Sequence, residues 1–261
     1  MKVGIFGYGF VGQALAGICK DEPAIYDPKF KDSYGSAYKV DMKKNDINFI
    51  CVGTPSEEDD DGKIDDAALM ETLEYLDDLK YTGLVVIKST IIYGYISEFL
   101  SKSKLRVVVN PEFLSQITSF EDAQKQTRIL IGCDNILDAK ILKQFYLEET
   151  MLPNTWELEF DICSTKEACD FKYIRNIYGA MLVTFWEMVH ETTDDNSRKM
   201  AALLEKYPLP SKMNRVGMDG ERGFGGACFP KDAAAWGHFH SDDFVNMLVS
   251  YNKVIRGESN E

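Results

Sequence analysis

The stretch KVGIFGYGFVGQALAGIC, residues 2–19, decides the fold. An apolar, strand-like run is followed by Gly7, Gly9 and Gly12 in the spacing G-x-G-x-x-G, and then by a helical segment. In this context the first glycine permits a tight turn, the second lets the backbone approach a pyrophosphate, and the third allows close helix packing. We therefore predict a dinucleotide-binding turn whose phosphates are held by the N-terminus of the helix.

An acidic residue, Asp27, ends the second strand-like run. A carboxylate at this place accepts hydrogen bonds from the adenosine ribose and disfavours a 2′-phosphate, so NAD is expected rather than NADP. Asp27 lies 15 residues after Gly12. The usual spacing is about 20 residues, so the helix or turn between Gly12 and Asp27 must be shorter than usual. A glycine-rich turn without a ligand is the alternative.

Short apolar runs alternate with helical stretches through residues 1–160. The expected strands are 2–6, 24–27, 48–52, 83–89, 105–110 and 128–132, with helices at 66–79 and 136–146. Such alternation is typical of a parallel sheet with helices on both faces. We predict an α/β fold, a Rossmann-like, doubly wound parallel sheet that binds NAD.

The pattern changes at Ser164, which forms a capping box with Glu167 and opens a run of about 25 residues with helical spacing. A Pro- and Gly-rich loop is expected at 207–226, and residues 232–256 are expected to be helical. We predict that residues 161–261 form a smaller, mainly helical domain.

Composition excludes several classes of protein. No apolar run reaches the roughly 18 residues of a membrane span, and no signal peptide is evident, so we expect a cytoplasmic protein. The formal net charge of −13 argues against nucleic acid as a partner. The six cysteines and three histidines show no zinc-ligand or disulfide spacing, so no metal is expected.

A second chemical motif, GFGGACFPKD, spans residues 223–232. Glycines bring the backbone close around Cys228, and Lys231 and Asp232 follow within one helical turn. A thiol beside a lysine is suited to nucleophilic attack. A lone cysteine is otherwise a small buried apolar residue.

Five segments together resemble the UDP-glucose and GDP-mannose dehydrogenases, the nucleotide-sugar 6-dehydrogenases. They occur in the family's order: GYGFVG (7–12), CVGTP (51–55), KST (88–90), NPEFL (110–114) and GFGGACFPKD (223–232). The resemblance includes Lys172 and Asn176, as K-x-x-x-N in the long helix, with Phe185 farther along, and so covers nearly the whole chain.

The resemblance implies a four-electron oxidation of a nucleotide sugar, with UDP-glucose converted to UDP-glucuronate as the leading expectation. The C6 alcohol becomes an aldehyde, Cys228 traps it as a thiohemiacetal, a second oxidation gives a thioester, and water releases the acid.

The resemblance also assigns residues. The expected catalytic residues are Cys228, Lys172, Asn176, Asp232, Thr90 and Glu112. The expected cofactor-binding residues are Gly7, Tyr8, Gly9, Phe10, Val11, Gly12, Asp27, Thr54, Thr90 and Lys231. The expected substrate-binding residues are Glu112, Phe113, Leu114, Lys172, Asn176, Gly225 and Cys228.

Physical roles follow for most of these residues. Lys172 and Asn176 would stabilise an oxyanion, and Asp232 with Thr90 would hold a catalytic water and accept a proton. Glu112 would assist thioester hydrolysis. Alternatives are a solvated surface position for Lys172 and a helix cap for Asp232; Lys231 either faces the cofactor or tunes Cys228.

The chain departs from the family pattern in three places, one of which is a shorter loop before Gly223. Ser115 and Gln116 stand where the family commonly has a glutamate two residues beyond NPEFL, and Gln116 cannot accept a proton. The sequence also ends at Glu261, so we expect the family's third, nucleotide-binding domain to be absent. The substrate is then held differently, completed by a partner, or smaller.

Two other functions stay open. One is a two-electron NAD-dependent alcohol dehydrogenase for a smaller substrate, and the other is a non-catalytic NAD-binding subunit. The family pairs through its long central helix, and the apolar stripe of residues 171–186 suits a homodimer or an internal core.

Overall fold

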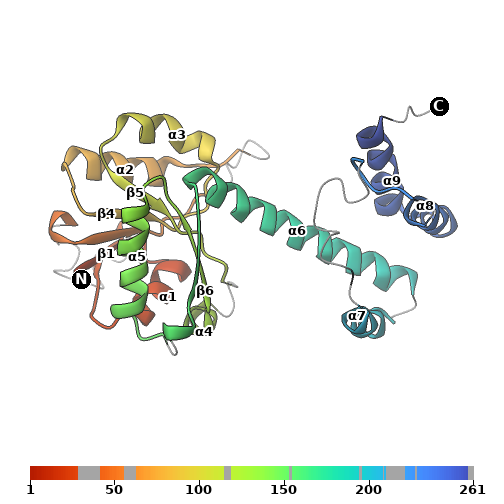
Figure 1. Ribbon diagram of the computed structural model, residues 1–261, viewed down its shortest axis with the longest axis horizontal. Coiled ribbons are helices and arrows are strands. Elements are labelled where there is room, and N and C mark those ends of the chain that lie inside the picture. The colour runs from red at the N-terminus through yellow and green to blue at the C-terminus, as the bar shows by residue number, and fades with distance from the viewer. Residues whose placement is uncertain are drawn as a thin grey trace. The chain divides into compact units, whose positions relative to one another are not determined.

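The computed structural model describes residues 1–28, 42–55, 63–114, 119–152, 155–193, 196–207, 209, 221–226 and 228–257. The chain divides into two compact units, Met1–Asn176 and Ile177–Glu261, and each is described by itself (Figure 1). The domain limits expected from the sequence stay predictions.

The first unit contains a mostly parallel sheet, as predicted. Its order in the described residues is β2-β1-β3-β4-β5-β6-β7. The strands are β1 (Val3–Phe6), β2 (Ala24–Tyr26), β3 (Ile47–Ile50), β4 (Leu84–Ile87), β5 (Arg106–Val109), β6 (Arg128–Gly132) and β7 (Glu159–Cys163).

The sheet departs from the parallel arrangement at the pairing of β5 with β6. β6 runs antiparallel to β5, with Val109 opposite Gly132, and β7 pairs with β6 in parallel. The strand β7 was not among those predicted. Its residues are exposed or partly exposed and none is buried, so it lacks the apolar run of a central strand.

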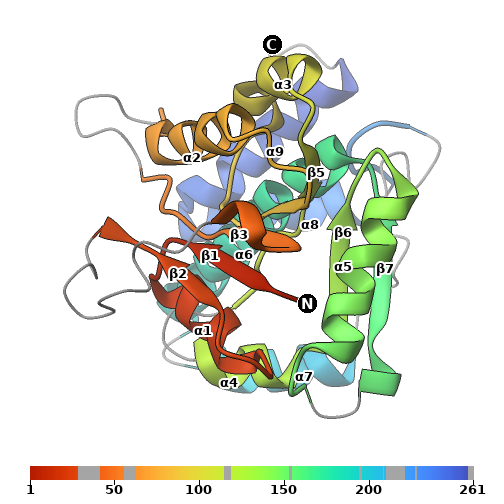
Figure 2. The same ribbon diagram turned by 90° about the vertical axis from the view of Figure 1, so that its left-hand side faces the viewer.

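Helices cover both faces of the sheet, which confirms the doubly wound arrangement. Figure 2 shows α1 (Phe10–Ile18) on one side of β1 and α2 (Ala67–Asp78) on the other. The first face also carries α4 (Ser119–Lys125) and α5 (Ile136–Glu148); the second carries α3 (Tyr93–Lys102).

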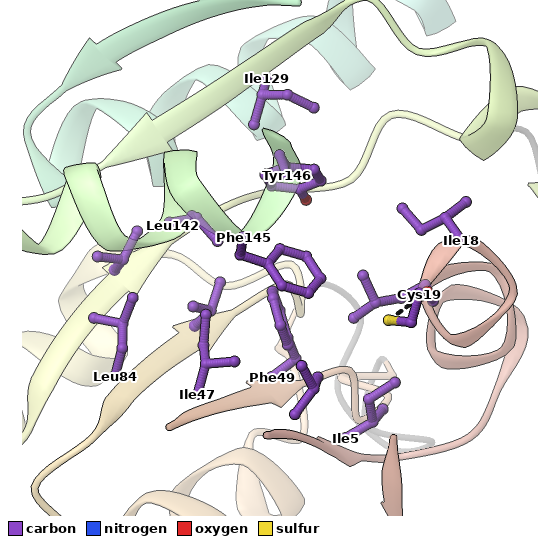
Figure 3. Packing of buried hydrophobic residues seen from close by; sticks show 14 of the residues in the cluster. Ile5, Ile18, Cys19, Ile47, Phe49, Leu84, Ile129, Leu142, Phe145 and Tyr146 are labelled. Carbon is purple, nitrogen blue, oxygen red and sulfur yellow. Dashed lines mark hydrogen bonds between the residues drawn. The ribbon is translucent and has the colours of Figure 1, made fainter. Parts of the chain in front are cut away.

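Side chains of one strand alternate between these two layers. Phe49 of β3 packs with the α1 and α5 layer, whereas its neighbour Ile50 packs with the α2 and α3 layer. In the first layer the rings of Phe49 and Phe145 lie 4.9 Å apart, and Leu142 is fully buried beside them (Figure 3).

The long helix α6 (Thr165–Thr192) begins at the predicted capping box. Ser164 N–H donates to Glu167 Oε2 at 2.8 Å, and Glu167 N–H donates to Ser164 Oγ at 3.2 Å. These two bonds satisfy donors that the first turn of a helix leaves unpaired.

The second unit is helical, with α7 (Ser197–Lys206), α8 (Phe229–His240) and α9 (Asp243–Arg256) after the end of α6. The region expected to be helical, 232–256, is helical but consists of two helices, because Ser241 adopts φ +52° and ends α8. Asp242 then caps α9 by accepting the Val245 N–H at 2.8 Å. Among the described residues, no helix combines the length and apolar character needed to cross a membrane.

Leu142→Ala in α5 is expected to lower the free energy of unfolding of the first unit by about 2–5 kcal/mol, because the side chain is fully buried and leaves a cavity. Leu137→Ala, in the same helix with 58% of the residue exposed, is the matched control and is expected to change it little. Urea unfolding followed by circular dichroism measures both; equal effects would contradict the described core.

Candidate functional site

The glycine turn after β1 has the geometry that a dinucleotide needs. Gly7 adopts φ +86°, and a Cβ there would lie 2.8 Å from the backbone of Cys51. A Cβ on Gly12 would lie 2.1 Å from the Gly7 carbonyl oxygen, whereas nothing lies within 4 Å of a Cβ on Gly9. The first and third glycines are therefore required by packing, and the second leaves room for a phosphate at the N-terminus of α1.

Asp27 lies beside this turn. It follows β2 directly, and its Oδ2 accepts the Tyr8 N–H at 2.7 Å. The short spacing between Gly12 and Asp27 is accommodated because α1 has only nine residues. The carboxylate and the phosphate-binding turn thus come together at the carboxyl ends of β1 and β2, where open α/β sheets bind ligands.

Hydrogen bonds fasten the segments that follow β3 and β4 to one another. Thr54 Oγ1 donates to the Thr90 carbonyl oxygen at 2.7 Å, and Ser89 Oγ donates to the Val52 carbonyl oxygen at the same distance. These bonds bring CVGTP and KST side by side. The two threonines expected at the cofactor therefore lie together.

The long helix reaches the NPEFL segment through Lys172. Its Nζ donates to the Glu112 carbonyl oxygen at 2.5 Å and lies 5.4 Å from the centroid of the Phe113 ring, while the Arg175 guanidinium lies 4.9 Å from that centroid. Burial and the neighbouring Arg175 lower the pKa of Lys172, although Glu112 opposes them. Lys172 is half-buried, so the alternative of a fully solvated surface lysine does not fit.

Two further expected residues of the first unit, Asn176 and Leu114, lie near Lys172 and Phe113 in the sequence. Asn176 follows Lys172 by one turn of α6 and is exposed, which leaves its amide accessible. Leu114 packs against the hydrophobic core instead of standing free. Ser115 and Gln116 lie outside the described residues.

A buried lysine, Lys88, was missed as a site residue although it opens the quoted KST motif. It lies at the end of β4 with only 3% of its surface exposed, and its Nζ is 2.8 Å from Glu112 Oε2. The signal was present: a lysine in the otherwise apolar run LVVIKS must find a partner if that run is a central strand.

The second unit carries the cysteine segment. Cys228 is exposed and occupies the N-cap position of α8, and its carbonyl oxygen accepts the Asp232 N–H at 2.8 Å. Lys231 Nζ lies 2.6 Å from Asp232 Oδ1, and both side chains are largely exposed. Asp232 therefore lies inside the first turn and is not the helix cap.

Asn252 of α9 forms hydrogen bonds with the glycine-rich segment before Cys228. The sequence analysis did not identify this residue. Phe224 N–H donates to Asn252 Oδ1 at 2.7 Å, and Asn252 Nδ2 donates to the Phe224 carbonyl oxygen at 2.9 Å. A Cβ on Gly223, which adopts φ +76°, would lie 2.4 Å from Asn252 Oδ1, and one on Gly225 would lie 2.7 Å from Arg256 Nη1. The close approach of α9 explains these two glycines.

All six cysteines of the sequence are described, and Cys228 alone is exposed. Burial raises the pKa of Cys19, Cys51 and Cys169 to about 12. Such thiols remain protonated near neutral pH, and the thiolate is the reactive form. Accessibility therefore distinguishes Cys228 from the other thiols.

Comparison with known proteins supports the expected resemblance. Residues 30–150 match the family model of the UDP-glucose/GDP-mannose dehydrogenase family, NAD binding domain. The UDP-glucose 6-dehydrogenase of Rickettsia bellii is 28% identical over 231 residues, which are 85% of this chain and 51% of that protein. That of Rhizobium meliloti is 26% identical over 282 residues, covering 90% of this chain and 62% of that protein.

Solved structures show the same fold. GDP-mannose dehydrogenase from Pseudomonas aeruginosa matches with a TM-score of 0.74 at 22% identity, over 98% of this chain and 69% of that one. A UDP-glucose dehydrogenase from Pyrobaculum islandicum matches with a TM-score of 0.61 at 23% identity, over 97% of this chain and 67% of that one.

Together the matches confirm the resemblance to nucleotide-sugar dehydrogenases, and they identify NAD as the cofactor through the matched NAD-binding domain. The chain spans about half to two thirds of the length of these curated relatives.

The exposure of Cys228 predicts selective alkylation. Iodoacetamide at neutral pH is expected to modify one thiol per folded chain at least about 10-fold faster than the rest, and Cys228→Ala is expected to remove this fast phase. Peptide mass spectrometry locates the label, with Cys163→Ala as the control. Fast labelling of a different cysteine would contradict the described burial.

Proposed function

We propose that the chain is an NAD-dependent nucleotide-sugar 6-dehydrogenase, which oxidises the primary C6 alcohol of the sugar to a carboxylate. UDP-glucose is the proposed substrate, because curated relatives such as those of Rickettsia bellii and Rhizobium meliloti are named UDP-glucose 6-dehydrogenases. The observation that carries the proposal is the contact between Lys172 Nζ and the Glu112 carbonyl, because it joins the K-x-x-x-N and NPEFL motifs at the carboxyl edge of the sheet.

The first unit would hold the cofactor. Gly9 would lie against the pyrophosphate, the N–H groups at the start of α1 would bind it, and Asp27 would face the ribose. Thr54 and Thr90 would lie near the nicotinamide end. NAD, bound twice in succession, would accept one hydride each time and so the two that the full oxidation releases.

Cys228 is the proposed nucleophile. Its sulfur adds to the carbon of the aldehyde made in the first oxidation, and a second oxidation turns the thiohemiacetal into a thioester. Water then adds to the thioester carbon, the C–S bond breaks, and the thiol is regenerated. Each turnover consumes one alcohol, one water and two NAD, and yields one carboxylate.

Other side chains would stabilise charge and move protons. The ammonium of Lys172 and the amide of Asn176 would donate to the oxyanion of each tetrahedral intermediate. Asp232, with Thr90, would bind a water and accept the alcohol proton, and Glu112 would activate the hydrolytic water.

Two alternatives make different predictions. A two-electron alcohol dehydrogenase would stop at the aldehyde and would not need Cys228. A non-catalytic subunit would bind NAD without turnover; the retention of Lys172, Cys228 and Asp232 with the rest of the motif residues counts against it.

A homodimer through α6 and a cytoplasmic location are part of the proposal. Support for the dimer comes from large apolar side chains of α6 that are 41–63% exposed, since a stripe of this kind favours burial. They are Phe171, Ile174, Ile177, Tyr178, Met181, Leu182 and Val183. A sedimentation mass equal to one chain at micromolar concentration would exclude this dimer.

The first test supplies NAD with a panel of UDP- and GDP-sugars and measures NADH and acid. Two NADH per carboxylate are expected with UDP-glucose, and Cys228→Ala is expected to reduce acid formation by at least about 10³-fold while NAD still binds. Cys163→Ala is the control. One NADH per aldehyde would favour the two-electron alternative, and NAD binding without any turnover would favour the non-catalytic subunit.

The lowered pKa of Lys172 predicts a pH dependence. Its charged form is the proposed oxyanion donor, so activity is lost as pH rises through that pKa. Arg175→Met removes a neighbouring positive charge, raises the pKa of Lys172, and is expected to move the alkaline limb of kcat/KM upward by up to about one pH unit. Arg198→Met, an exposed position in α7, is the control; an unmoved limb in Arg175→Met would contradict this role.

A further inference from the structure

Lys88 is a charged group buried under the proposed site. An ammonium removed from water is costly unless charge and hydrogen bonds compensate it. Its Nζ lies 2.8 Å from Glu112 Oε2 and 3.0 Å from Asn110 Oδ1, and it also donates to the Tyr146 hydroxyl at 3.4 Å. The ammonium thus contacts oxygen atoms of two other segments, the NPEFL segment after β5 and the helix α5.

The acceptors around Lys88 are themselves fixed. Tyr146 OH donates to Asn110 Oδ1 at 2.6 Å, and Asn110 Nδ2 donates to the Leu130 carbonyl oxygen at 2.8 Å. Burial raises the pKa of Tyr146 to about 12, so it stays a neutral phenol. This network leaves the Glu112 carboxylate as the negative partner of the Lys88 charge.

Both oxygens of Glu112 are oriented. Oε2 pairs with Lys88, while Oε1 accepts the Phe113 N–H at 2.9 Å. The backbone of the same residue accepts Lys172 Nζ. One residue therefore links the buried lysine on one side to the proposed oxyanion donor on the other.

We propose that Lys88 is a positioning residue for thioester hydrolysis: its buried ammonium fixes the orientation of the Glu112 carboxylate, and through Glu112 it sets the place of Lys172. The inference rests on the proposed function. In the hydrolytic step the Glu112 carboxylate accepts a proton from the water whose oxygen bonds to the thioester carbon. The C–S bond then breaks, and the electron pair leaves with the Cys228 sulfur.

The electrostatics agree with this role. Burial, the largest single influence, lowers the pKa of Lys88, but Glu112 together with Tyr146 and Cys51 raises it above its ordinary value. The lysine is therefore a permanent cation near neutral pH. This permanent cation, 2.8 Å from Glu112 Oε2, holds that carboxylate oxygen in one place.

A purely structural ion pair would behave differently. Its loss would lower stability and slow every step together, whereas loss of a positioning residue for hydrolysis should slow only the last step. The covalent adduct on Cys228 separates the two, because it accumulates only when it forms faster than it is hydrolysed.

The test compares Lys88→Met with the wild-type chain, NAD and UDP-glucose in rapid mixing, followed by intact-protein mass spectrometry. Lys88→Met is expected to give a burst of two NADH per chain, then a steady rate about 100-fold below wild type, with the acyl adduct accumulated on Cys228. Glu112→Gln is expected to match it, and the double variant to be no slower. Lys88→Arg is expected to restore part of the rate.

The matched control is Lys102→Met, which removes an exposed Lys–Glu pair, with Glu98, from α3 and is expected to leave the kinetics unchanged. Lys88→Gln keeps hydrogen bonding within the network and carries the same expectation if Lys88→Met does not fold. If the burst and the steady phase slow equally and no adduct accumulates, the inference about Lys88 is overturned, while the proposed function stands. Absence of NADH with the wild-type chain overturns the proposed function as well.

Discussion

The parallel pairing of β1, β3, β4 and β5 is the constraint on which the first unit depends. Parallel strands end at the same edge of a sheet, so the segments that follow them must lie together there. These segments are the glycine turn, CVGTP, KST and NPEFL, and hydrogen bonds such as Ser89 Oγ to the Val52 carbonyl join neighbours along the edge. Side-chain geometry at the edge is therefore set by strand register, which the apolar core fixes from both faces.

Two layers of buried side chains make this edge of the sheet rigid. The charged side chain of Lys88 lies between the hydrophobic core and the edge. Lys88 continues a strand whose preceding residues are completely buried, so its ammonium enters an apolar environment. The hydrogen bonds and ion pair with Glu112, Asn110 and Tyr146 compensate the desolvation of this ammonium. They do so in one arrangement, because each of these side chains has few other hydrogen-bond partners. A single buried charge can thus specify the orientation of a loop that apolar packing alone would leave less defined.

Local sequence signals predicted most of the first unit and less of the second. The strand runs, the glycine turn and the Ser164–Glu167 capping box are governed by neighbours in sequence, and the structure forms all of them. The antiparallel course of β6 was not predictable, because apolar periodicity carries no strand direction. The break at Ser241 was missed because a non-glycine residue seldom adopts positive φ. Lys88 and Asn252 act across long sequence separations, which motif spacing does not report.

Charge distribution reconciles an acidic chain with an anionic ligand. The net charge of −13 belongs to the whole molecule, whereas Lys88, Lys172 and Arg175 gather on or beneath the NPEFL segment, with Glu112 as their adjacent anion. At physiological ionic strength screening acts over about 8 Å, so exposed acids farther away weaken the field of these cations little. A small anion such as a sugar nucleotide experiences that local field, and a long polyanion would also meet the acidic surroundings. The same arrangement that would favour the proposed nucleotide sugar would therefore disfavour nucleic acid.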